Sequence, residues 1–522
     1  MRFRQNLPKT AFTLKWLGFV TAVWVQAISG NNNSFSNYSD ALKSIMNLTQ
    51  LELNILSVTK DVGKAFGLLA GLASDRLPTW MILLIGSVEG LVGYGAQWLI
   101  VSEKITVSYW QMCIFVCMGG NSTTWMNTAV LVTCIRNFQK DRGPVSGILK
   151  GFVGLSTAIF TNVCSALFSD SATSFLLMLS LVPLGVCLAA MVFLREVPPA
   201  DNQLEEKEEA RYFMVTNGIA IVVALYLLAY DFSGSHGQVF SLVFVGILLS
   251  LLASPLLIPL YAFFKTFKTG CIIESNDDEG IDEQLLSQET AFETQQTAQQ
   301  TLTGATSEAE TELIEAKRKP VIVNNNIGQI GLALGYDDVS VFVSLFSIGG
   351  FFGRIISGSG SEYLIKKMGS PRPLWTAASQ IIMSLGLIVM ALALPGSLYI
   401  GSIVVGLCYG IRLSVTVPTA SELFGLKHYG LVYNVLILNL PLGSFLFSGL
   451  LAGLIYDMEA TTTTGGGDTC SGAHCYRLVF IIMSITCLIG FVLDMLLAIK
   501  TKGIYAKIQA SKNSNKSPGS SE

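Results

Sequence analysis

Residues 174–194 read SFLLMLSLVPLGVCLAAMVFL, a run of 21 residues without a charged side chain. About 20 apolar residues in a helix cross the hydrocarbon core of a bilayer. This run has no polar face with which a helix could meet water on a soluble protein. It therefore predicts a membrane-spanning helix, and runs of similar length and character recur along the chain.

The composition of the whole chain indicates the same environment. Of its 522 residues, 51% are hydrophobic and 13% are charged, and the mean hydropathy is +0.54. Soluble domains carry about 25% charged residues, so this chain lacks much of the surface charge that contact with water requires. The net charge of −3 provides no broad basic surface for phosphates, and we expect no nucleic acid partner.

Apolar windows predict about thirteen membrane helices in an all-α membrane protein. The first window is interpreted as a helix rather than a signal peptide because many further spans follow it. The predicted spans are residues 14–30, 52–74, 79–101, 109–134, 145–168, 174–194, 212–231, 239–263, 337–357, 374–394, 398–420, 430–456 and 477–498.

Positive charge sets the expected orientation, because Lys and Arg favour the cytoplasmic side of a membrane. Both termini are then expected in the cytoplasm of a multi-pass protein of the plasma membrane or the vacuolar membrane. The residues that decide this are Arg136, Lys140, Arg142, Lys366, Lys367, Arg372, Lys500, Lys502, Lys507 and Lys512.

Residues 31–50 then face away from the cytoplasm, and this loop contains three Asn-x-Ser/Thr sequences. They begin at Asn32, Asn37 and Asn47, and such sequences are acceptors for N-glycosylation in a non-cytosolic loop. The alternative is that an Asn-rich stretch produces them by chance. The chain is therefore a candidate glycoprotein.

An acidic segment divides the chain. Residues 271–316 contain twelve acidic residues and no Lys or Arg, and such a segment cannot bury an apolar core. We expect a disordered cytoplasmic loop there. The predicted domains are an N-terminal six-helix bundle (1–200), two additional membrane helices (201–264), the acidic loop (265–319), a C-terminal bundle (320–500) and a cytoplasmic tail (501–522).

The number of predicted membrane crossings disagrees with the expected orientation between the acidic loop and the span at 337–357. The loop is expected in the cytoplasm, but this span must begin on the opposite side, because its far end meets Lys366 and Lys367. One more crossing is needed near residue 320, but a window moved upstream would bury three basic residues, 317–319, at about 2.5–3.5 kcal/mol each. Three alternatives stay open. One helix is absent from this form of the protein, residues 320–336 cross as an unwound segment, or the C-terminal block is inverted.

Two copies of a glycine–acid pattern follow predicted spans and suggest duplicated halves. Gly71 precedes Asp75 and Arg76 in the first copy, and Gly358 precedes Glu362 in the second. Glycine permits close helix approach, and the acid can contact a helix N-terminus or an Arg across the bundle. Such a contact is expected to act as a conformational switch, although an ordinary turn at a helix end would look similar.

This pattern resembles the cytoplasmic loop signature of the major facilitator superfamily, except that its later glycine and basic pair are replaced by residues 78–80. More of the chain is similar to the plant nodulin-like branch of that superfamily. The matching motifs are WVQ (24–26), TCIRNF (133–138), KGFVGLS (150–156), NNIGQIG (325–331) and PTASELFG (418–425). The resemblance implies two six-helix bundles, here with two extra spans and without the family helix that precedes residue 325.

Ionisable residues inside spans are costly, so they usually face a cavity or a partner. Asp61, with Lys60 and Lys64, marks either a charged cavity wall or a fixed ion pair. Glu89 is either a proton carrier or a buried structural acid. Arg412 either binds an anionic solute or pairs permanently with an acid of another helix.

Polar residues in spans also suggest a path for a solute, with interhelical hydrogen bonds as the alternative. They are Gln26, Asn121, Asn127 and Asn439. Lys150, beside a series of glycines, is expected to reach toward the cytoplasm. Cys470 and Cys475 share a predicted non-cytosolic loop, where a disulfide could form.

No catalytic cluster, metal-ligand spacing or phosphate-binding loop is apparent, so we expect neither an enzyme nor a metal or cofactor. The sequence predicts a secondary carrier for a small polar or anionic solute, with proton coupling as a hypothesis based on Glu89 and Asp61. The alternative is a non-transporting receptor or an inactive shortened isoform. Its expected partners are the solute, the lipid bilayer and protons.

Overall fold

The computed structural model describes residues 7–30, 35–168, 171–197, 203–232, 237–273, 340–438 and 474–514, with short pieces between 442 and 472. The helices are α1 (Leu7–Ile28), α2 (Ser36–Met46), α3 (Gln50–Ala65), α4 (Gly67–Ser74), α5 (Thr79–Val101), α6 (Tyr109–Asn137), α7 (Arg142–Phe168), α8 (Ala172–Phe193), α9 (Gln203–Phe232), α10 (Gln238–Ala253), the 3-10 turn η2 (Ser254–Leu256), α11 (Leu257–Ile273), α15 (Ser340–Met368), α16 (Pro373–Ala391), α17 (Ser397–Leu423), α18 (Tyr429–Ile437) and α21 (His474–Ser514). Two short strands, β1 (Thr461–Thr462) and β2 (Asp468–Thr469), pair antiparallel.

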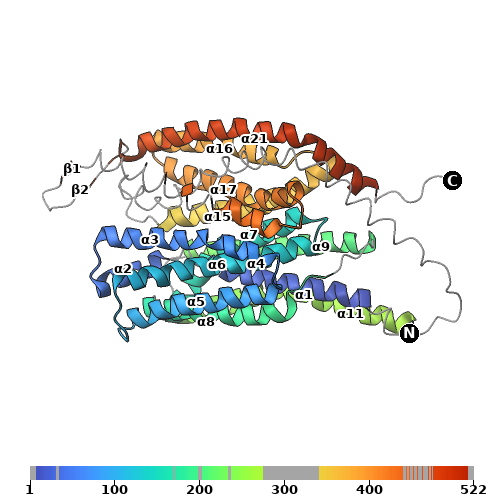
Figure 1. Ribbon diagram of the computed structural model, residues 1–522, viewed down its shortest axis with the longest axis horizontal. Coiled ribbons are helices and arrows are strands. Elements are labelled where there is room, and N and C mark those ends of the chain that lie inside the picture. Colours follow the sequence, from blue (N-terminus) through green and yellow to red (C-terminus); the bar gives the residue numbers. More distant parts are fainter. Residues whose placement is uncertain are drawn as a thin grey trace.

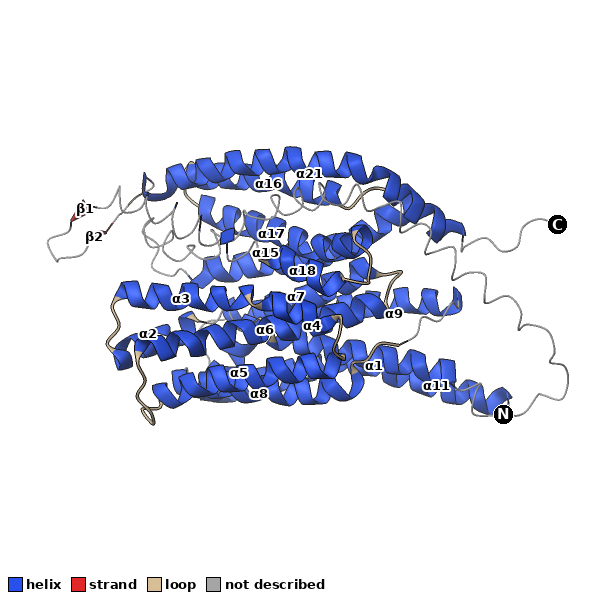
Figure 2. Ribbon diagram, viewed as in Figure 1, coloured by secondary structure: helices blue, strands red, loops and turns tan. Residues whose placement is uncertain are grey.

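The helices run side by side along the long axis of the molecule (Figure 1). The early helices α1, α3, α5, α6 and α8 form one layer, and α15, α16, α17 and α21 form another, with α7 between them. Figure 2 shows that helix makes up nearly all of the described body, and that β1 and β2 lie outside it. The predicted all-α class is confirmed.

Nine of the described helical segments are long and apolar enough to cross a membrane. Each of the thirteen predicted spans overlaps a helix, although the span at 430–456 is described continuously only as α18. The chain is therefore a multi-pass membrane protein. Residues 320–336, where a helix is expected to be missing, lie outside the described residues, and the gap there stays a prediction.

Two predicted spans are not continuous helices. The span at 52–74 breaks at Phe66, and α4 then begins at Gly67, where a Cβ atom would overlap the Thr124 side chain of α6. The span at 239–263 is interrupted by η2, because Pro255 has no N–H to continue the helical bonds. Local sterics, which hydropathy does not detect, explain both breaks.

The loop expected at residues 31–50 contains a helix, α2, that ends at Asn47. Asn47 is exposed and has a positive φ of 51°, a conformation that Asn tolerates at a helix C-terminus. Its exposure leaves room for a glycan. The side chains of Asn32 and Asn37 lie outside the described residues, so glycosylation stays a prediction at all three positions.

Buried apolar side chains form two clusters, and the first also includes Phe351 and Ile355 of α15, so it crosses between the halves. In the first, Trp16 and Phe19 of α1 make edge-to-face contacts with Phe138, and with Phe213 of α9 they complete an aromatic cluster. The second core lies among α15, α16, α17 and α21 and includes Met383. Edge-to-face aromatic pairs add about 0.5–1.5 kcal/mol beyond the burial of their surface.

The two halves are closed against each other at one end, which we call the basic end (Arg136, Lys140, Arg142, Lys366, Lys367 and Arg372). There the Arg372 side chain is fully buried and binds Glu362 at 2.5 Å and Glu422 at 2.8 Å. Glu362 also accepts a bond from the backbone N–H of Gly143, at the start of α7 in the other half. Its negative charge is favourable at a helix N-terminus.

Gly358 permits this closure, and its substitution provides a test. A Cβ atom there would lie 2.7 Å from both the Gly143 carbonyl oxygen and the Gly147 Cα atom. Both are backbone atoms, so Gly358→Ala must separate α7 from α15, at a cost of about 1–3 kcal/mol. We expect a lower melting temperature in detergent. Gly185→Ala, which would meet nothing within 4 Å, is the control, and equal melting of the two variants would contradict the close contact.

Candidate functional site

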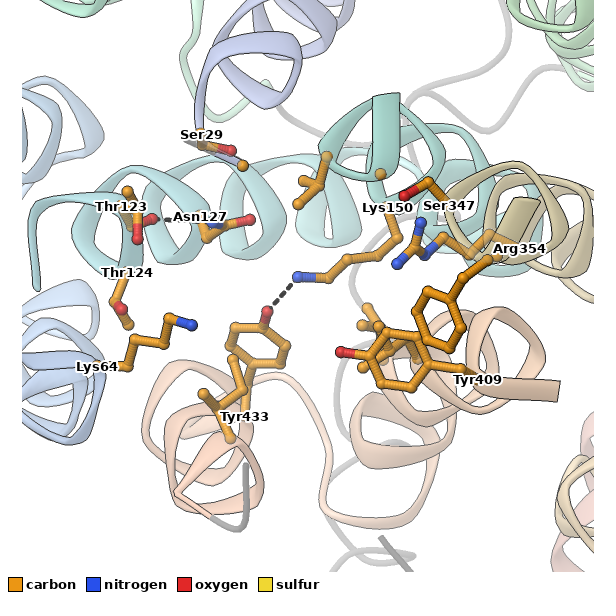
Figure 3. Close-up of a pocket in the computed structure, with 18 residues that line it drawn as sticks. Ser29, Lys64, Thr123, Thr124, Asn127, Lys150, Ser347, Arg354, Tyr409 and Tyr433 are labelled. Atoms are coloured by element: carbon orange, nitrogen blue, oxygen red, sulfur yellow. Dashed lines mark hydrogen bonds between the residues drawn. The ribbon is translucent and has the colours of Figure 1, made fainter. Parts of the chain in front are cut away.

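A cavity of about 160 Å³ lies between the two halves. The end of α1 and helices α3, α6 and α7 line it from one half, and α15, α17 and α18 line it from the other (Figure 3). It is smaller than the roughly 300–1,000 Å³ of pockets for drug-sized ligands, so it suits a small solute. Its labelled lining residues are Ser29, Lys64, Thr123, Thr124, Asn127, Lys150, Ser347, Arg354, Tyr409 and Tyr433.

Three cationic side chains line the cavity, and none of its described lining residues is an acid. Lys64 of α3 pairs with Asp61 one turn earlier at 2.8 Å. Lys150 of α7 donates a hydrogen bond of 2.5 Å to the hydroxyl of Tyr433 in α18, so this bond joins the two halves. Figure 3 shows Lys150 between Lys64 and Arg354, with its amine pointing toward Tyr433.

Arg354 of α15 is the least compensated of the three cations. The residue is buried, with 6% of its surface exposed. Among the described residues it makes no ion pair, and its Nε has no hydrogen-bond partner. The guanidinium carbon lies 5.8 Å from the centroid of the Tyr409 ring, which supports the charge from one side. A buried charge is costly unless it is paired and hydrogen-bonded, so this group is suited to an anionic ligand.

Helix α6 supplies neutral polar groups to the same cavity. Its polar stretch includes Thr123, whose hydroxyl binds Gly120, and Asn127, whose amide N–H₂ donates to the Thr123 carbonyl at 2.8 Å. The amide oxygen of Asn127 has no partner among the described residues. The cavity thus offers an acceptor as well as its cations.

The structure brings some of the sequence-predicted residues to this cavity and leaves others outside. Asn127 lines it, Asp61 contacts a lining lysine, and Gln26 is buried one turn behind Ser29, to which it is hydrogen-bonded. Glu89 and Asn121 bind each other at 2.8 Å, and neither lines the cavity. Asn439 lies outside the described residues.

Arg412 was a candidate solute contact, and the structure places it away from the cavity. The residue is 3% exposed, and the charge acting on it comes from Asp494 of α21. This position favours the alternative of a permanent pair within the C-terminal bundle. The expectation that Lys150 reaches the cytoplasm is wrong, because its amine is bonded to Tyr433 inside the cavity.

The residues of the repeated pattern lie at the basic end. Asp75 binds Arg136 at 3.1 Å within its own half, and Arg76 is exposed. A Cβ atom on Gly71 would lie 2.7 Å from the Gly430 carbonyl of α18. Gly71 and Gly358 therefore each hold a close contact between the halves, one to α18 and one to α7.

Sequence analysis missed Arg354, Tyr409 and Tyr433. Arg354 could have been found, since it is an ionisable residue inside the predicted span at 337–357 and so meets the criterion that selected Arg412. The two tyrosines gave no such signal. In a membrane protein tyrosine is common at the membrane–water interface and in contacts between helices. Only the fold shows that these two tyrosines face a cation.

No group of three or more His, Cys, Asp or Glu side chains gathers into a possible metal site within the described parts of the chain. The disulfide predicted between Cys470 and Cys475 stays a prediction, because Cys470 lies outside the described residues. Among the described side chains, Cys113, Cys117, Cys134, Cys187 and Cys408 form no disulfide.

The fold and this cavity define a class: an all-α, multi-pass membrane protein with a cationic cavity enclosed by both of its halves. Comparison with known proteins gives the family. Residues 15–260 match the Nodulin-like family, and residues 316–507 match the C-terminal domain of NFD4. The match to the Nodulin-like family covers the N-terminal part of the chain and agrees with the resemblance that the motifs indicated.

Two relatives extend this result. The chain is 29% identical to the protein NUCLEAR FUSION DEFECTIVE 4 of Arabidopsis thaliana, over 98% of this chain and 93% of the relative. It is also 27% identical to the probable transporter MCH1 of Yarrowia lipolytica, over 27% of this chain and 30% of the relative. The first similarity covers both halves of the molecule.

The position of Arg412 leads to a prediction. Replacing one member of a buried charge pair costs about 3–5 kcal/mol, because the other charge stays buried alone. Arg412→Ala should therefore lower the melting temperature in detergent, and Arg412→Ala with Asp494→Ala should recover part of it. A single variant that melts like the wild type would exclude the pair.

Proposed function

We propose that the protein is a secondary carrier of the major facilitator type for a small anionic solute, and not an enzyme. The observation that carries the proposal is the cavity with Lys64, Lys150 and Arg354 on its wall. Since helices of both halves contribute these cations, movement of one half against the other would expose the solute to each side of the membrane in turn.

Three further observations support this function. The nodulin-like family and the similarity to a probable transporter favour transport. Helices α15, α16, α17 and α21 also share a core of their own, which allows the C-terminal half to move as a unit. The halves are closed at the basic end. We place that end and both termini in the cytoplasm. The solute would then enter the cavity from the opposite side of the plasma membrane or the vacuolar membrane.

Removal of single cations tests the proposal. Hydrogen bonds to charged groups contribute about 1.5–3 kcal/mol, so Arg354→Ala and Lys150→Ala should each weaken solute affinity about tenfold to 100-fold. The measurement is uptake of radiolabelled lactate, succinate and inorganic phosphate by reconstituted vesicles. Lys427→Ala, which removes an exposed cation, is the control. If no anion enters vesicles with the wild-type protein, the proposal fails.

Proton coupling is part of the proposal, and we assign it to Asp61 rather than Glu89. Asp61 holds Lys64, which lines the cavity, whereas Glu89 binds Asn121 outside the lining. Lys60 and Lys64 on α3 and Tyr409 on α17 are the groups whose charges interact with Asp61. A proton on Asp61 would release Lys64 to bind the anion, so the proton and the anion would bind together.

A pH profile distinguishes the two acids. Uptake by the wild type should rise as the pH on the solute side falls, because protonation of Asp61 frees Lys64. Asp61→Asn should remove this dependence, while Glu89→Gln keeps it. The initial uptake rate at a series of pH values is the measurement. Loss of pH dependence in Glu89→Gln alone would assign the proton to Glu89 and reject our choice.

The second candidate is a receptor or an inactive form, and the apparent loss of a helix near residue 320 favours it. Such a protein would bind an anion without accumulating it. Binding shown by thermal stabilisation, together with no uptake in the same preparation, would support this candidate over the carrier.

A further inference from the structure

The guanidinium of Arg354 rests against a glycine of the opposite half. A Cβ atom built on Gly154 of α7 would overlap Nη1 of Arg354 and lie 3.1 Å from its guanidinium carbon. Any other residue at this position would displace the planar group from its present place. Gly154 therefore leaves the space that the Arg354 side chain occupies.

This contact lies within the cavity itself. Gly154 and Arg354 both belong to the lining, and Lys150 is one turn before Gly154 on the same helix. Residues four apart on a helix share a face, so the lysine and the guanidinium are neighbours. On its remaining sides Arg354 meets the Tyr409 ring and, more loosely, Gly350 of its own helix.

The other contacts of α7 with α15 are of a different kind. A Cβ atom on Gly147 would lie 2.9 Å from the Arg354 carbonyl oxygen, and one on Gly151 would lie 3.3 Å from side-chain atoms of Phe351 and Ile355. These glycines set the spacing of the two helices. Gly143, at the start of α7, also faces a guanidinium, but it is that of Arg372, which pairs with Glu362 and Glu422. Gly154 faces a guanidinium that has no acidic partner in the described parts of the chain.

We propose that Gly154 is a positioning residue that seats the Arg354 guanidinium, so that its planar fork binds the oxygens of a carboxylate or phosphate on the solute. Arg holds such groups through two parallel N–H···O bonds, and this geometry depends on the plane of the guanidinium. The inference rests on the proposed anionic solute. Since the two residues belong to opposite halves, the seat exists only while α7 and α15 are in contact.

Thermal melting of the purified full-length protein tests this role. Stabilisation by an anion grows with its concentration relative to its dissociation constant, so titrations of lactate, succinate and inorganic phosphate give affinities. Chloride at equal ionic strength is the reference. Comparing the affinities for the two carboxylates with the affinity for phosphate shows which kind of oxyanion the site binds.

We expect Gly154→Ala to weaken binding of the stabilising anion at least tenfold while the melting temperature without anion changes little. Gly151→Ala, one turn earlier at the same helix contact, should stay within about threefold of the wild type. Arg354→Lys should also weaken binding, because an ammonium lacks the planar fork. Gly154→Ala added to Arg354→Lys should cause no further loss, since no guanidinium remains to be displaced.

Three results would overturn the inference. The first is equal affinity of Gly154→Ala and the wild type. The second is equal loss in Gly154→Ala and Gly151→Ala, which would assign the effect to helix spacing. The third is full additivity with Arg354→Lys. If no anion stabilises the wild type, the proposed function fails and this inference fails with it, whereas stabilisation that Gly154→Ala leaves unchanged rejects the inference alone.

Discussion

A bilayer offers no water to buried charge, and this constraint explains where the charged side chains of the chain are found. Each charged group inside the protein needs a counter-charge, a hydrogen bond or a wet cavity. Arg372 has two glutamates, and Lys64 has Asp61. Lys150 donates to a tyrosine hydroxyl. Arg354, held beside an aromatic ring and a glycine, makes no ion pair among the described residues, and it lies on the wall of the cavity.

The contact between α7 and α15 connects the closed end to the cavity. At the basic end, Gly143 and Gly358 bring the two backbones together and Glu362 meets the start of α7. Further along the same pair of helices, Gly154 makes room for the guanidinium of Arg354. One interface therefore closes the molecule at one end and shapes the cavity in its middle. A change that separates these helices acts on both.

Much of this architecture could be predicted from sequence, because a membrane helix needs only a long apolar run. Every predicted span overlaps a helix, and the motifs indicated the family whose model matches residues 15–260. Breaks within helices could not be predicted from hydropathy, which detects neither the close approach of Gly67 to Thr124 nor the turn at Pro255.

The candidate site was predicted only in part. The sequence indicated Asn127, Asp61 and Lys64 because polar groups in a span are costly, and the structure places Asn127 and Lys64 on the wall of the cavity with Asp61 beside them. Arg412 shows the limit of that rule. It satisfies the rule as well as Arg354 does, and only the folded structure shows that it lies outside the cavity lining, where the charge of Asp494 acts on it. Which face of a helix meets which neighbour is tertiary information.

Helix α6 differs from its neighbours in one respect. It has 29 residues, yet it is not among the nine described segments that are apolar enough to span a membrane, and it contributes Thr123, Thr124 and Asn127 to the lining. Isolated in lipid, such a segment would expose costly polar groups. During biosynthesis α6 should therefore enter the bilayer together with an apolar neighbour such as α5, so the polar groups of the cavity delay the assembly of the protein.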